Sequence, residues 1–319
     1  MTSPRLDATI AIIGSGFIGR GWAARFAAAG AQVRLWDAEP GVPAKALAWL
    51  DETLPAMEKL ELIADARGAR ARVTGHATLE DAVRGVDYIQ ENAPEKLDLK
   101  RELHARIDAA DCAGAVIGSS TSTFPGTKIF TGLRHAARCL VAHPANPPHL
   151  LPVVELVPMP VTSPAATERC RALMAAAGQV PVLLKKEIEG FVMNRLQAGV
   201  IGEAMSLIAD GVIEPDDLDA VMRHSLGLRW SFMGPFETMD LNAPGGFMDY
   251  ATRYGGVLQA LGRDLGVAKP WTREAMEKVE AARRSRIPAG DLVKRGTWRD
   301  RRLMALAAHK HATNRKEGE

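Results

Sequence analysis

The segment ATIAIIGSGFIGRGWAARFAAAGAQVRLWD, residues 8–37, contains a short apolar run, a glycine motif, an alanine-rich stretch and a second apolar run. The first run, Ala8–Ile13, is typical of a strand buried on both faces. The alanine-rich stretch predicts a helix that Gly30 closes. The second run, Val33–Asp37, predicts another strand and ends in an acid. The segment therefore predicts a β–α–β unit whose first turn is rich in glycine.

The glycine motif has the spacing of a dinucleotide-binding turn, and its candidate contact residues are Gly14, Gly16, Phe17, Ile18 and Gly19. Gly14 is expected to make the tight turn, Gly16 to let the backbone approach a pyrophosphate, and Gly19 to let the helix pack on the strand. The helix N-terminus would receive the phosphates. Asp37 follows Gly19 by 18 residues and would bind the ribose hydroxyls and repel a 2′-phosphate. The motif therefore predicts NAD as cofactor; the alternative is a glycine-rich turn without a ligand.

Strand and helix patterns alternate over the first part of the chain and then stop. Beyond residue 37, strands are predicted at 73–74, 86–90, 115–119 and 180–184, and helices at 43–72, 78–84, 96–110 and 163–177. From Glu189 onward the spacing is helical apart from a loop at Gly227–Pro235. The predicted fold class is α/β, a Rossmann-type doubly wound, mostly parallel sheet followed by an all-α C-terminal domain. We expect residues 1–187 to form the NAD-binding domain and residues 188–319 the helical domain for substrate binding and dimerisation.

The composition excludes several classes of protein. The formal net charge is only +2 and aromatic residues make up 5%, so nothing indicates binding to nucleic acid or to a membrane surface. Three cysteines, Cys112, Cys139 and Cys170, form no CxxC pair, which argues against a disulfide framework or a zinc site and fits a reducing cytosol. The chain shows neither a signal-peptide pattern nor an apolar run of membrane-spanning length. We therefore expect a cytoplasmic protein without a metal.

A histidine and a glutamate each follow an apolar run in Leu140–Val157, which reads LVAHPANPPHLLPVVELV. The four prolines between them predict a rigid, irregular connection between two adjacent strands. Such strands would bring His143 and Glu155 together. A carboxylate in a dry site fixes the histidine tautomer and stabilises the imidazolium, so the pair is a candidate catalytic base with its orienting acid. The alternative is a satisfied core histidine beside a charged residue of an edge strand.

Further polar residues follow the predicted strands or begin the first C-terminal helix. Glu91–Glu95 forms the turn after one strand, where an open α/β sheet binds its ligand. Ser119–Thr123 is a run of hydroxyls after the next strand, and one of them is expected to bind a substrate oxygen, although such runs also cap helices and form turns. Asn194 opens a long apolar helix, expected to be buried against a second subunit. Its amide needs partners, either a ligand or a neighbouring backbone group.

Taken in order, the glycine motif, Ser122, His143, Glu155 and Asn194 make the chain resemble the L-3-hydroxyacyl-CoA dehydrogenase superfamily over essentially its whole length. Within that superfamily it looks most like the λ-crystallin / L-gulonate 3-dehydrogenase branch. The segments that carry this finer resemblance are ENAPEKLDLKREL, SSTST, AHPANPP, VVELVP, GFVMNRLQ and MGPFETMDLNAPGG. The resemblance implies an NAD-dependent 3-hydroxy acid dehydrogenase that forms a homodimer through its helical C-terminal domain.

The resemblance also implies a catalytic role for each residue of this set. His143 is similar to the general base that takes the hydroxyl proton as hydride leaves C3 of the substrate for the nicotinamide. Glu155 matches the carboxylate that orients and polarises that histidine. Ser122 and Asn194 match the side chains that hydrogen-bond the reacting oxygen or the histidine, so both are also candidate substrate contacts.

Two further cofactor contacts follow from the resemblance. Glu95 matches the family's motif acid near the nicotinamide side of the cofactor. The family's lysine in that turn is missing at its usual spacing, where Asp98 stands. Lys100 is the nearest substitute downstream, and we expect it to take over that contact.

Two features favour a small free acid over a CoA ester as substrate. The stretch 43–72 carries only Lys45 and Lys59 before its arginine-rich end, whereas a phosphate-bearing carrier needs fixed cations. The resemblance places Arg229 and Trp230 in a loop at the site, where Arg229 could bind a substrate carboxylate bidentately. A surface arginine or a domain-interface salt bridge is the alternative for Arg229.

We therefore expect L-gulonate as the leading candidate substrate. Three alternatives stay open. The first is a short-chain 3-hydroxyacyl-CoA such as 3-hydroxybutyryl-CoA. The second is L-carnitine, for which Trp230 alone supports an aromatic cage. The third is a catalytically silent, λ-crystallin-like structural protein, for which the complete set of polar site residues would be unnecessary.

Overall fold

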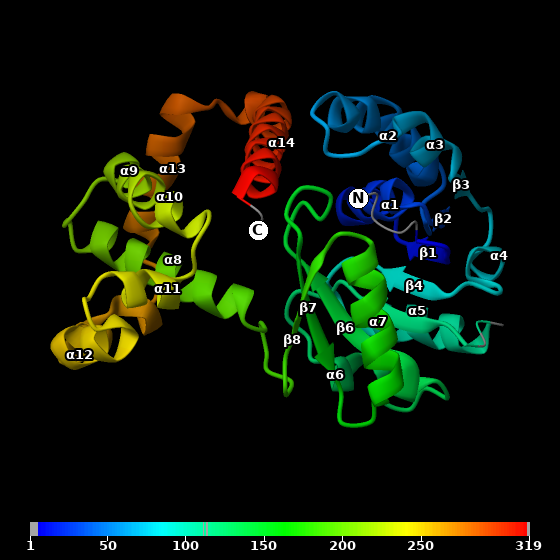
Figure 1. The fold of residues 1–319 in the computed structure, drawn as a ribbon, viewed down its shortest axis with the longest axis horizontal. Coiled ribbons are helices and arrows are strands. Elements are labelled where there is room, and N and C mark those ends of the chain that lie inside the picture. The colour runs from blue at the N-terminus through cyan, green and yellow to red at the C-terminus, as the bar shows by residue number, and fades with distance from the viewer. Residues whose placement is uncertain (1–5, 111, 113, 318–319) are drawn as a thin grey trace. The chain divides into compact units, whose positions relative to one another are not determined.

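The computed structural model describes residues 6–110, 112 and 114–317 (Figure 1). The chain forms two compact units, one of the residues up to Asn194 together with those from Thr297 onward, and one of Arg195–Gly296. The last helix, α14 (Leu292–Glu317), therefore belongs to the first unit over most of its length. We expected a single boundary between residues 187 and 188, and this expectation did not include a return of the chain to the first unit.

An eight-stranded sheet forms the centre of the first unit in the described part of the chain. Its order is β3-β2-β1-β4-β5-β6-β7-β8, and its strands are β1 (Thr9–Ile13), β2 (Gln32–Trp36), β3 (Val73–Gly75), β4 (Tyr88–Glu91), β5 (Val116–Ser119), β6 (Cys139–Pro144), β7 (Val153–Pro158) and β8 (Val180–Leu183). Strands β1 to β6 are parallel to their neighbours, whereas β7 is antiparallel to β6 and parallel to β8. The mostly parallel sheet confirms the predicted fold class.

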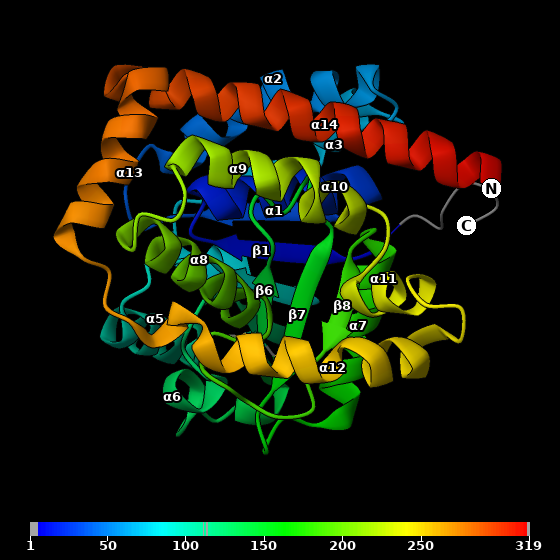
Figure 2. The same cartoon turned by 90° about the vertical axis from the view of Figure 1, so that its left-hand side faces the viewer.

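Helices cover both faces of this sheet. Besides α14 they are α1 (Phe17–Ala29), α2 (Val42–Lys59), α3 (Ala66–Ala71), α4 (Leu79–Val83), α5 (Leu97–Ala109), α6 (Gly126–Phe130), α7 (Pro164–Ala176) and the short 3₁₀ turn Ala136–Arg138. Along β1, Ile10 and Ile12 enter one hydrophobic core and Ala11 and Ile13 the other, because successive side chains of a strand point to opposite faces. Helices α1, α2 and α7 contribute to the first core and α4, α5 and α6 to the second, and Figure 2 shows α1 and α5 on opposite sides of the sheet.

The single helix expected over 43–72 is two helices in the structure. Helix α2 ends at Lys59, and Glu61 then has a left-handed backbone with φ of 57°. Helix α3 begins after its own N-cap, where Asp65 Oδ1 accepts a hydrogen bond of 2.7 Å from the backbone N–H of Gly68. A residue in the left-handed region cannot continue a right-handed helix. The prediction of one helix was wrong because side-chain spacing alone does not show where the backbone turns.

The three cysteines are buried side chains of the first unit with free thiols. Burial raises the pKa of Cys139 and of Cys170 to about 12. Thiols with so high a pKa do not form thiolates near neutral pH. They therefore act as small core residues, as predicted.

The second unit is helical, as predicted. Its helices are the part of α8 (Met193–Ala209) from Arg195 on, α9 (Pro215–His224), α10 (Leu226–Trp230), α11 (Pro235–Leu241), α12 (Gly246–Asp264) and α13 (Arg273–Arg286), with 3₁₀ turns at Gly266–Ala268 and Ala289–Asp291. The loop predicted over Gly227–Pro235 is wrong in its first part, because α10 continues to Trp230. A local hydrogen bond from the Arg229 N–H to the Ser225 carbonyl forms this helical turn. Gly227 had favoured a loop at this position.

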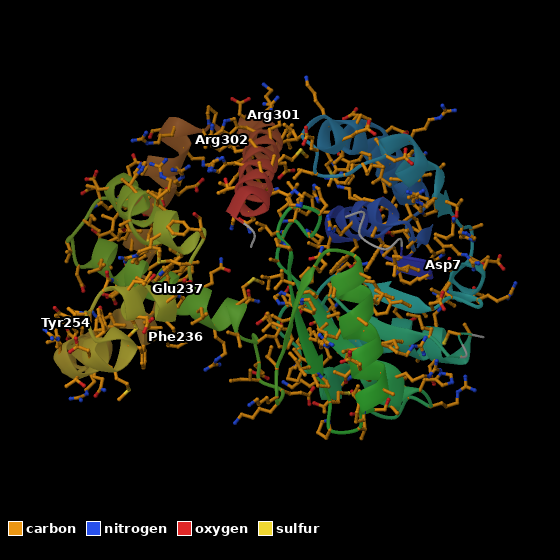
Figure 3. The ribbon with its side chains drawn as sticks, viewed as in Figure 1. Asp7, Phe236, Glu237, Tyr254, Arg301 and Arg302 are labelled. Carbon is orange, nitrogen blue, oxygen red and sulfur yellow. The ribbon has the colours of Figure 1, made fainter. Side chains whose placement is uncertain are left out.

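Large apolar side chains are exposed on α11 and α12 within this unit. Phe236 and Tyr254 are 72% and 47% exposed, and both are labelled in Figure 3. Met248, on the first turn of α12, is 72% exposed as well. Several large apolar side chains this exposed on two packed helices are typical of a surface that a partner covers. Among the described residues, no helix combines the length and apolar character needed to cross a membrane.

Candidate active site

The glycine turn between β1 and α1 provides a backbone cradle. Gly14 has φ of +88°, a conformation that L side chains rarely adopt. A Cβ on Gly19 would lie 1.9 Å from the Gly14 carbonyl oxygen, so only glycine lets α1 pack this closely. A Cβ on Gly16 would have no described atom within 4 Å, so it would stand in open space in front of the helix. Helix α1 has no side-chain cap, and its first N–H groups are available to an anion.

A cavity of about 580 Å³ opens at this turn. Its lining includes seven of the residues predicted for the site, namely Gly14, Gly16, Phe17, Ile18, Asp37, Glu95 and Ser122. They come from the carboxyl ends of β1, β2, β4 and β5, which meet at one edge of the parallel sheet. The volume suits an extended small molecule or cofactor. The fold therefore brings together six of the predicted cofactor residues, whereas Gly19 and Lys100 are not among the described residues that line the cavity, and the donor-rich turn fits a dinucleotide.

Asp37 has a second task that the sequence did not indicate. Its Oδ2 accepts a hydrogen bond of 2.8 Å from the backbone N–H of Ser15, inside the glycine turn. Its Oδ1 accepts one of 3.0 Å from the N–H of Glu39. The carboxylate thus holds the turn in place while it also lines the cavity.

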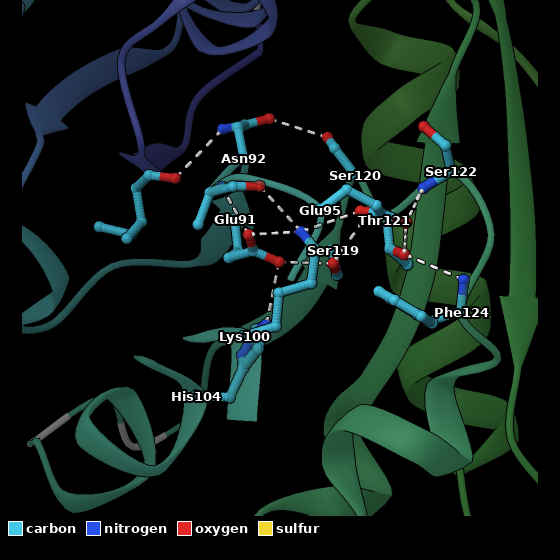
Figure 4. Close-up of polar contacts among 12 residues, drawn as sticks. Glu91, Asn92, Glu95, Lys100, His104, Ser119, Ser120, Thr121, Ser122 and Phe124 are labelled. Atoms are coloured by element: carbon cyan, nitrogen blue, oxygen red, sulfur yellow. Dashed lines mark hydrogen bonds and ion pairs between the residues drawn. The ribbon is translucent and has the colours of Figure 1, made fainter. Parts of the chain in front are cut away.

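Glu95 organises the run of hydroxyl residues after β5 (Figure 4). Its Oε1 accepts hydrogen bonds from the Thr121 hydroxyl at 2.6 Å and from the backbone N–H groups of Ser122 and Thr123 at 3.0 and 3.1 Å. Burial would raise the pKa of Glu95, but these hydrogen bonds and the charge of Lys100 outweigh it and lower the pKa. The ionised carboxylate therefore fixes the backbone that presents Ser122 to the cavity.

A buried ionic cluster lies behind this loop, centred on Glu91 (Figure 4). Glu91 is fully buried, and its Oε1 lies 2.9 Å from Lys100 Nζ. Its Oε2 lies 3.2 Å from His104 Nε2 and also accepts a hydrogen bond from the Ser119 hydroxyl. Burial would raise the pKa of Glu91, but the hydrogen bond from His104 and the charge of Lys100 lower it to about 2. Glu91 is therefore a buried, ionised carboxylate near neutral pH.

The structure corrects the role expected of Lys100. Its side chain is only 1% exposed, and it is not among the described residues that line the cavity. Its ammonium donates to Glu91 and to the Ala93 carbonyl at 3.0 Å and lies 3.5 Å from Glu95 Oε2. The reason is geometric, because α5 turns Lys100 toward the sheet. Lys100 thus supports the cofactor-side loop from behind instead of lining the cavity.

Glu91 is the functional candidate that sequence reasoning missed. It was assigned to a turn, whereas it is the last residue of β4. One signal was present: Lys100 and His104 are four residues apart and therefore share one face of α5. Two titratable residues on the buried face of a helix need a carboxylate opposite them.

His143 and Glu155 lie side by side, as predicted. They are register partners of the antiparallel strands β6 and β7, with His143 Nδ1 2.8 Å from Glu155 Oε2, and they are 4% and 2% exposed. A carboxylate can only accept, so the proton is on Nδ1 and Nε2 is the basic nitrogen. The other oxygen, Glu155 Oε1, accepts from the backbone N–H groups of Val192 and Met193 at 2.8 and 2.9 Å.

These contacts keep Glu155 charged. Burial would raise its pKa, but the hydrogen bonds from His143, Met193 and Val192 lower it. The carboxylate also sits at the start of α8, where the helix dipole favours negative charge. An imidazole held by an ionised carboxylate can take up a proton at Nε2 and be stabilised as imidazolium.

Asn194 is tied to the hydroxyl run, because its Nδ2 donates a hydrogen bond of 2.8 Å to the Ser122 carbonyl. This is the neighbouring backbone partner considered for the amide above, and it also joins two predicted site residues. Arg229 and Trp230 belong to the second unit, on α10. There, Arg229 Nε is buried without a hydrogen-bond partner among the described residues, and Trp230 is 40% exposed.

Comparison with known proteins shows which family has this arrangement. Residues 9–188 match the NAD binding domain of 3-hydroxyacyl-CoA dehydrogenase, and residues 190–286 match the C-terminal domain of the same family. The chain belongs to the 3-hydroxyacyl-CoA dehydrogenase family. NAD is accordingly its cofactor, and the protein is an NAD-dependent dehydrogenase that acts on a hydroxy acid.

The family members most similar to this chain include both crystallins and enzymes. A λ-crystallin homolog of Bos taurus is 43% identical over 98% of this chain and 99% of its own length. An L-carnitine dehydrogenase of Streptomyces griseus is 40% identical over 88% of this chain and 81% of its own length. These matches confirm the resemblance to the λ-crystallin branch.

Solved structures agree with this family assignment. The 5-formyl-3-hydroxy-2-methylpyridine 4-carboxylic acid 5-dehydrogenase, described as an NAD⁺-dependent dismutase, superposes with a TM-score of 0.82 at 28% identity, over 96% of this chain and 98% of its own. An (S)-3-hydroxybutyryl-CoA dehydrogenase of Ralstonia eutropha gives a TM-score of 0.67 at 27% identity, over 86% of this chain and 94% of its own.

The role of Gly16 in the family's cofactor turn can be tested by adding a single methyl group. Gly16→Ala should fold normally, because the new Cβ has no described neighbour within 4 Å. It should weaken NADH binding by at least about tenfold, because the methyl group fills the space in front of the α1 N-terminus. Fluorescence titration with NADH measures this.

Gly199→Ala is the matched control, since its Cβ would also meet nothing, on helix α8 of the second unit. Unchanged NADH affinity in Gly16→Ala would show that the cofactor does not pass this turn.

Proposed function

We propose that the protein oxidises the C3 hydroxyl group of a small, polar 3-hydroxy acid to the 3-oxo acid, with L-gulonate as the leading candidate. The observation that carries the proposal is the buried pair of His143 Nδ1 and Glu155 Oε2, 2.8 Å apart on adjacent strands. Bound NAD⁺ supplies the hydride acceptor. The chain itself supplies a base, the charge that stabilises its protonated form, and the contacts that position the hydroxyl group.

In this proposal the proton of the substrate hydroxyl moves to His143 Nε2. Nδ1 keeps its own proton in the hydrogen bond to Glu155, so the ring becomes an imidazolium beside an ionised carboxylate. That neighbouring charge favours the protonated ring and thereby lowers the barrier to proton removal. The reacting carbon is left as a carbonyl once its hydride has departed.

Ser122 and Asn194 are proposed to hold the reacting oxygen. Ser122 lines the cavity, and its backbone is fixed from one side by Glu95 and from the other by Asn194. Because the backbone of Ser122 is held at both its N–H and its carbonyl, the residue loses little freedom on binding substrate and its contact is preorganised. We also propose the cofactor roles of Gly14, Gly16, Gly19 and Asp37 on the geometry of the turn.

A free acid is favoured by the scarcity of cations on α2, the segment where a phosphate-bearing carrier would need them. Helix α2 carries only two lysines, Lys45 and Lys59. The sequence identity to λ-crystallin proteins supports the resemblance to the λ-crystallin / L-gulonate 3-dehydrogenase branch. That resemblance is the reason for choosing L-gulonate. L-Carnitine is the second candidate substrate, because relatives at 40% identity are L-carnitine dehydrogenases.

A panel of substrates tests the proposal. NADH formation is followed by absorbance with L-gulonate, L-carnitine, 3-hydroxybutyrate and 3-hydroxybutyryl-CoA at matched concentrations. We expect L-gulonate to give the highest kcat/KM. A CoA ester that is better by about tenfold, or about 1.4 kcal/mol of transition-state binding, would overturn the choice of a free acid. A protein that binds NAD but turns over none of these substrates would support the silent structural role.

Arg229 is proposed to bind the substrate carboxylate, with Trp230 beside it. The Nε of Arg229 is buried without a partner among the described residues, so its guanidinium has donors to offer. Arg229→Met should therefore raise KM for a carboxylate substrate by about tenfold or more and change kcat much less.

Arg223→Met is the control, because Arg223 is an exposed arginine of α9 in the same unit. Steady-state kinetics of both variants measures KM and kcat and tests whether Arg229 binds the substrate. Equal KM values for Arg229→Met and the unmodified protein would remove Arg229 from the substrate site.

We also propose a cytoplasmic homodimer in which residues 1–187 bind NAD and residues 188–319 contribute substrate contacts and the dimer interface. The exposed apolar side chains of α11 and α12 support an interface in this part of the chain. The three free, buried thiols suit a reducing compartment. Sedimentation equilibrium measures the oligomeric state.

A further inference from the structure

A second cavity, of about 610 Å³, lies within the first unit and has no function in the proposed reaction. It is bounded by the Pro148–Pro152 connection between β6 and β7, by the start of β8 and by α14 from Leu303 onward. None of its described lining residues is shared with the cavity at the glycine turn. The packing of Met304 into the main hydrophobic core fixes α14 at its rim.

Two nearly buried polar side chains in this cavity lack hydrogen-bond partners. His149 is 6% exposed, and neither ring nitrogen has a partner among the described residues. Gln179 is 5% exposed; its Nε2 donates to the Pro148 carbonyl at 2.9 Å, but its Oε1 has no described partner. Buried polar groups are normally satisfied, so such atoms indicate that a ligand or water binds there.

The charge of the cavity favours an anion. Arg25, Lys310 and His311 line it, whereas no aspartate or glutamate is among its described lining residues. Arg25 is anchored by a hydrogen bond from its Nε to the Ala177 carbonyl, which leaves its terminal nitrogens as further donors. A guanidinium in a partly dry pocket is suited to bind a carboxylate group, although Glu58 and Glu61 line the adjoining cavity that Arg25 also reaches.

The remaining wall is aliphatic. Leu150, Leu303 and Leu306 belong to it, together with Met57 and Val180. Most of the lining is therefore apolar, and the polar exceptions are Arg25, His149, Gln179, Lys310, His311 and Asn314. A ligand that matches this surface has an aliphatic chain and one polar end.

The protonation state of His149 agrees with such a ligand. Burial lowers its pKa to about 4, Arg20, Arg299 and Arg25 act in the same direction, and Asp300 opposes them. The imidazole is therefore neutral near pH 7, with one nitrogen that donates and one that accepts. It can donate to a carboxylate oxygen without carrying a charge itself.

We propose that this cavity is a second binding site, for an aliphatic carboxylate of medium chain length. The carboxylate is bound by Arg25 and His149, and the chain lies along the leucines of the wall. A hydroxyl group on the chain would donate to Gln179 Oε1, which has no partner among the described residues.

Isothermal titration calorimetry on the full chain tests the site with sodium octanoate as probe. We expect one octanoate to bind per chain. Acetate, which lacks the chain, and octanol, which lacks the charge, should each bind at least about tenfold more weakly. Octanoate should bind His143→Ala as well as it binds the unmodified protein. Absence of saturable octanoate binding, or octanol binding as tight as octanoate, would overturn the proposal.

A pair of tryptophan substitutions locates the binding. Leu306 is 45% exposed at the cavity, so Leu306→Trp should fill it without disturbing the fold and weaken octanoate binding at least about tenfold. Val161→Trp, at a residue between β7 and α7 that is 60% exposed, is the control and should bind octanoate normally.

Both tryptophan variants should keep their NADH affinity and dehydrogenase activity, which separates this site from the reaction itself. Unchanged octanoate binding in Leu306→Trp, or loss of binding in His143→Ala, would place the octanoate elsewhere and overturn the assignment. Failure of the substrate panel would leave this test unaffected.

Discussion

Replacing His143 with alanine is expected to lower kcat by about 10³-fold and to leave NADH affinity nearly unchanged. The reason is that His143 Nε2 is the proposed proton acceptor, whereas the cavity at the glycine turn has no described contribution from His143. Stopped-flow hydride transfer and NADH fluorescence titration measure the two quantities separately. A large loss of NADH affinity with intact kcat would make His143 a structural residue.

His135 offers a matched control in the same unit. Its Nδ1 lies 2.8 Å from Asp108 Oδ1, so it is also a histidine paired with a carboxylate, although its side chain is 27% exposed. His135→Ala should retain nearly full activity. The activity of Glu155→Gln should fall between those of His143→Ala and His135→Ala. The amide keeps a hydrogen bond to the ring, but the charge that stabilises the imidazolium is lost.

Replacing Glu91 with glutamine is expected to lower the free energy of unfolding by about 3–5 kcal/mol. The substitution removes the carboxylate that lies 2.9 Å from the buried Lys100 ammonium and leaves it only the longer contact of 3.5 Å to Glu95, and a poorly compensated buried cation is costly. Urea unfolding followed by circular dichroism measures the change. Glu80→Gln, which breaks the exposed pair with Arg106, is the control and should cost less than about 1 kcal/mol.

The double variant Glu91→Gln/Lys100→Met separates pairing from packing. If loss of the buried ion pair causes the destabilisation, the double variant should lose less unfolding free energy than the two single variants lose in sum. The reason is that neither charge of the pair is then left without the other. Additive losses would show that Glu91 and Lys100 contribute independently and would contradict the cluster as described.

Glu91 should also determine part of the pH dependence of the free energy of unfolding. The pKa of Glu91 is lowered to about 2 from its ordinary value of 4.5. A carboxyl group whose pKa is lower in the folded than in the unfolded state stabilises the folded protein. This stabilisation is fully present at a pH above the pKa in the unfolded state, and it is lost as the pH falls through the pKa in the folded state.

The contribution is roughly 3 kcal/mol, present above about pH 4.5 and lost toward pH 2. The unfolding free energies of the unmodified protein and of Glu91→Gln should therefore converge between pH 5 and pH 2. A constant difference over this range would show that Glu91 titrates normally.

The predictions that succeeded rest on local patterns. The glycine turn was predictable because the positive φ of Gly14 and the close backbone approach at Gly19 exclude other residues. The adjacency of His143 and Glu155 was predictable because two short apolar runs joined by a proline-rich connection favour neighbouring strands, and the structure shows that these strands are antiparallel. The alternation of strands and helices followed from side-chain periods of two and 3.6 residues.

The errors have two physical origins. Local backbone conformation explains the wrong helix over 43–72 and the wrong loop at Gly227, and contacts distant along the sequence explain Lys100. Lys100 was expected at the cofactor because it is the nearest substitute downstream for the lysine that the resemblance implies in that turn, whereas the packing of α5 on the sheet directs its ammonium to Glu91. Which side of a helix faces the core depends on the elements that cover it, and sequence spacing does not contain that information.

By itself, the sequence determined the class of fold, the nucleotide-binding turn and the paired histidine and glutamate, because each depends on residue types and short-range geometry. Only the tertiary structure decided the buried position of Glu91, the hold of Asp37 on the glycine turn, and the return of α14 to the first unit. The second cavity arises from that return, since Leu303 and Leu306 reach Arg25 and His149 only through the folded chain. Such sites depend on burial and on long-range packing, whose free energy is a property of the whole unit and not of any single segment.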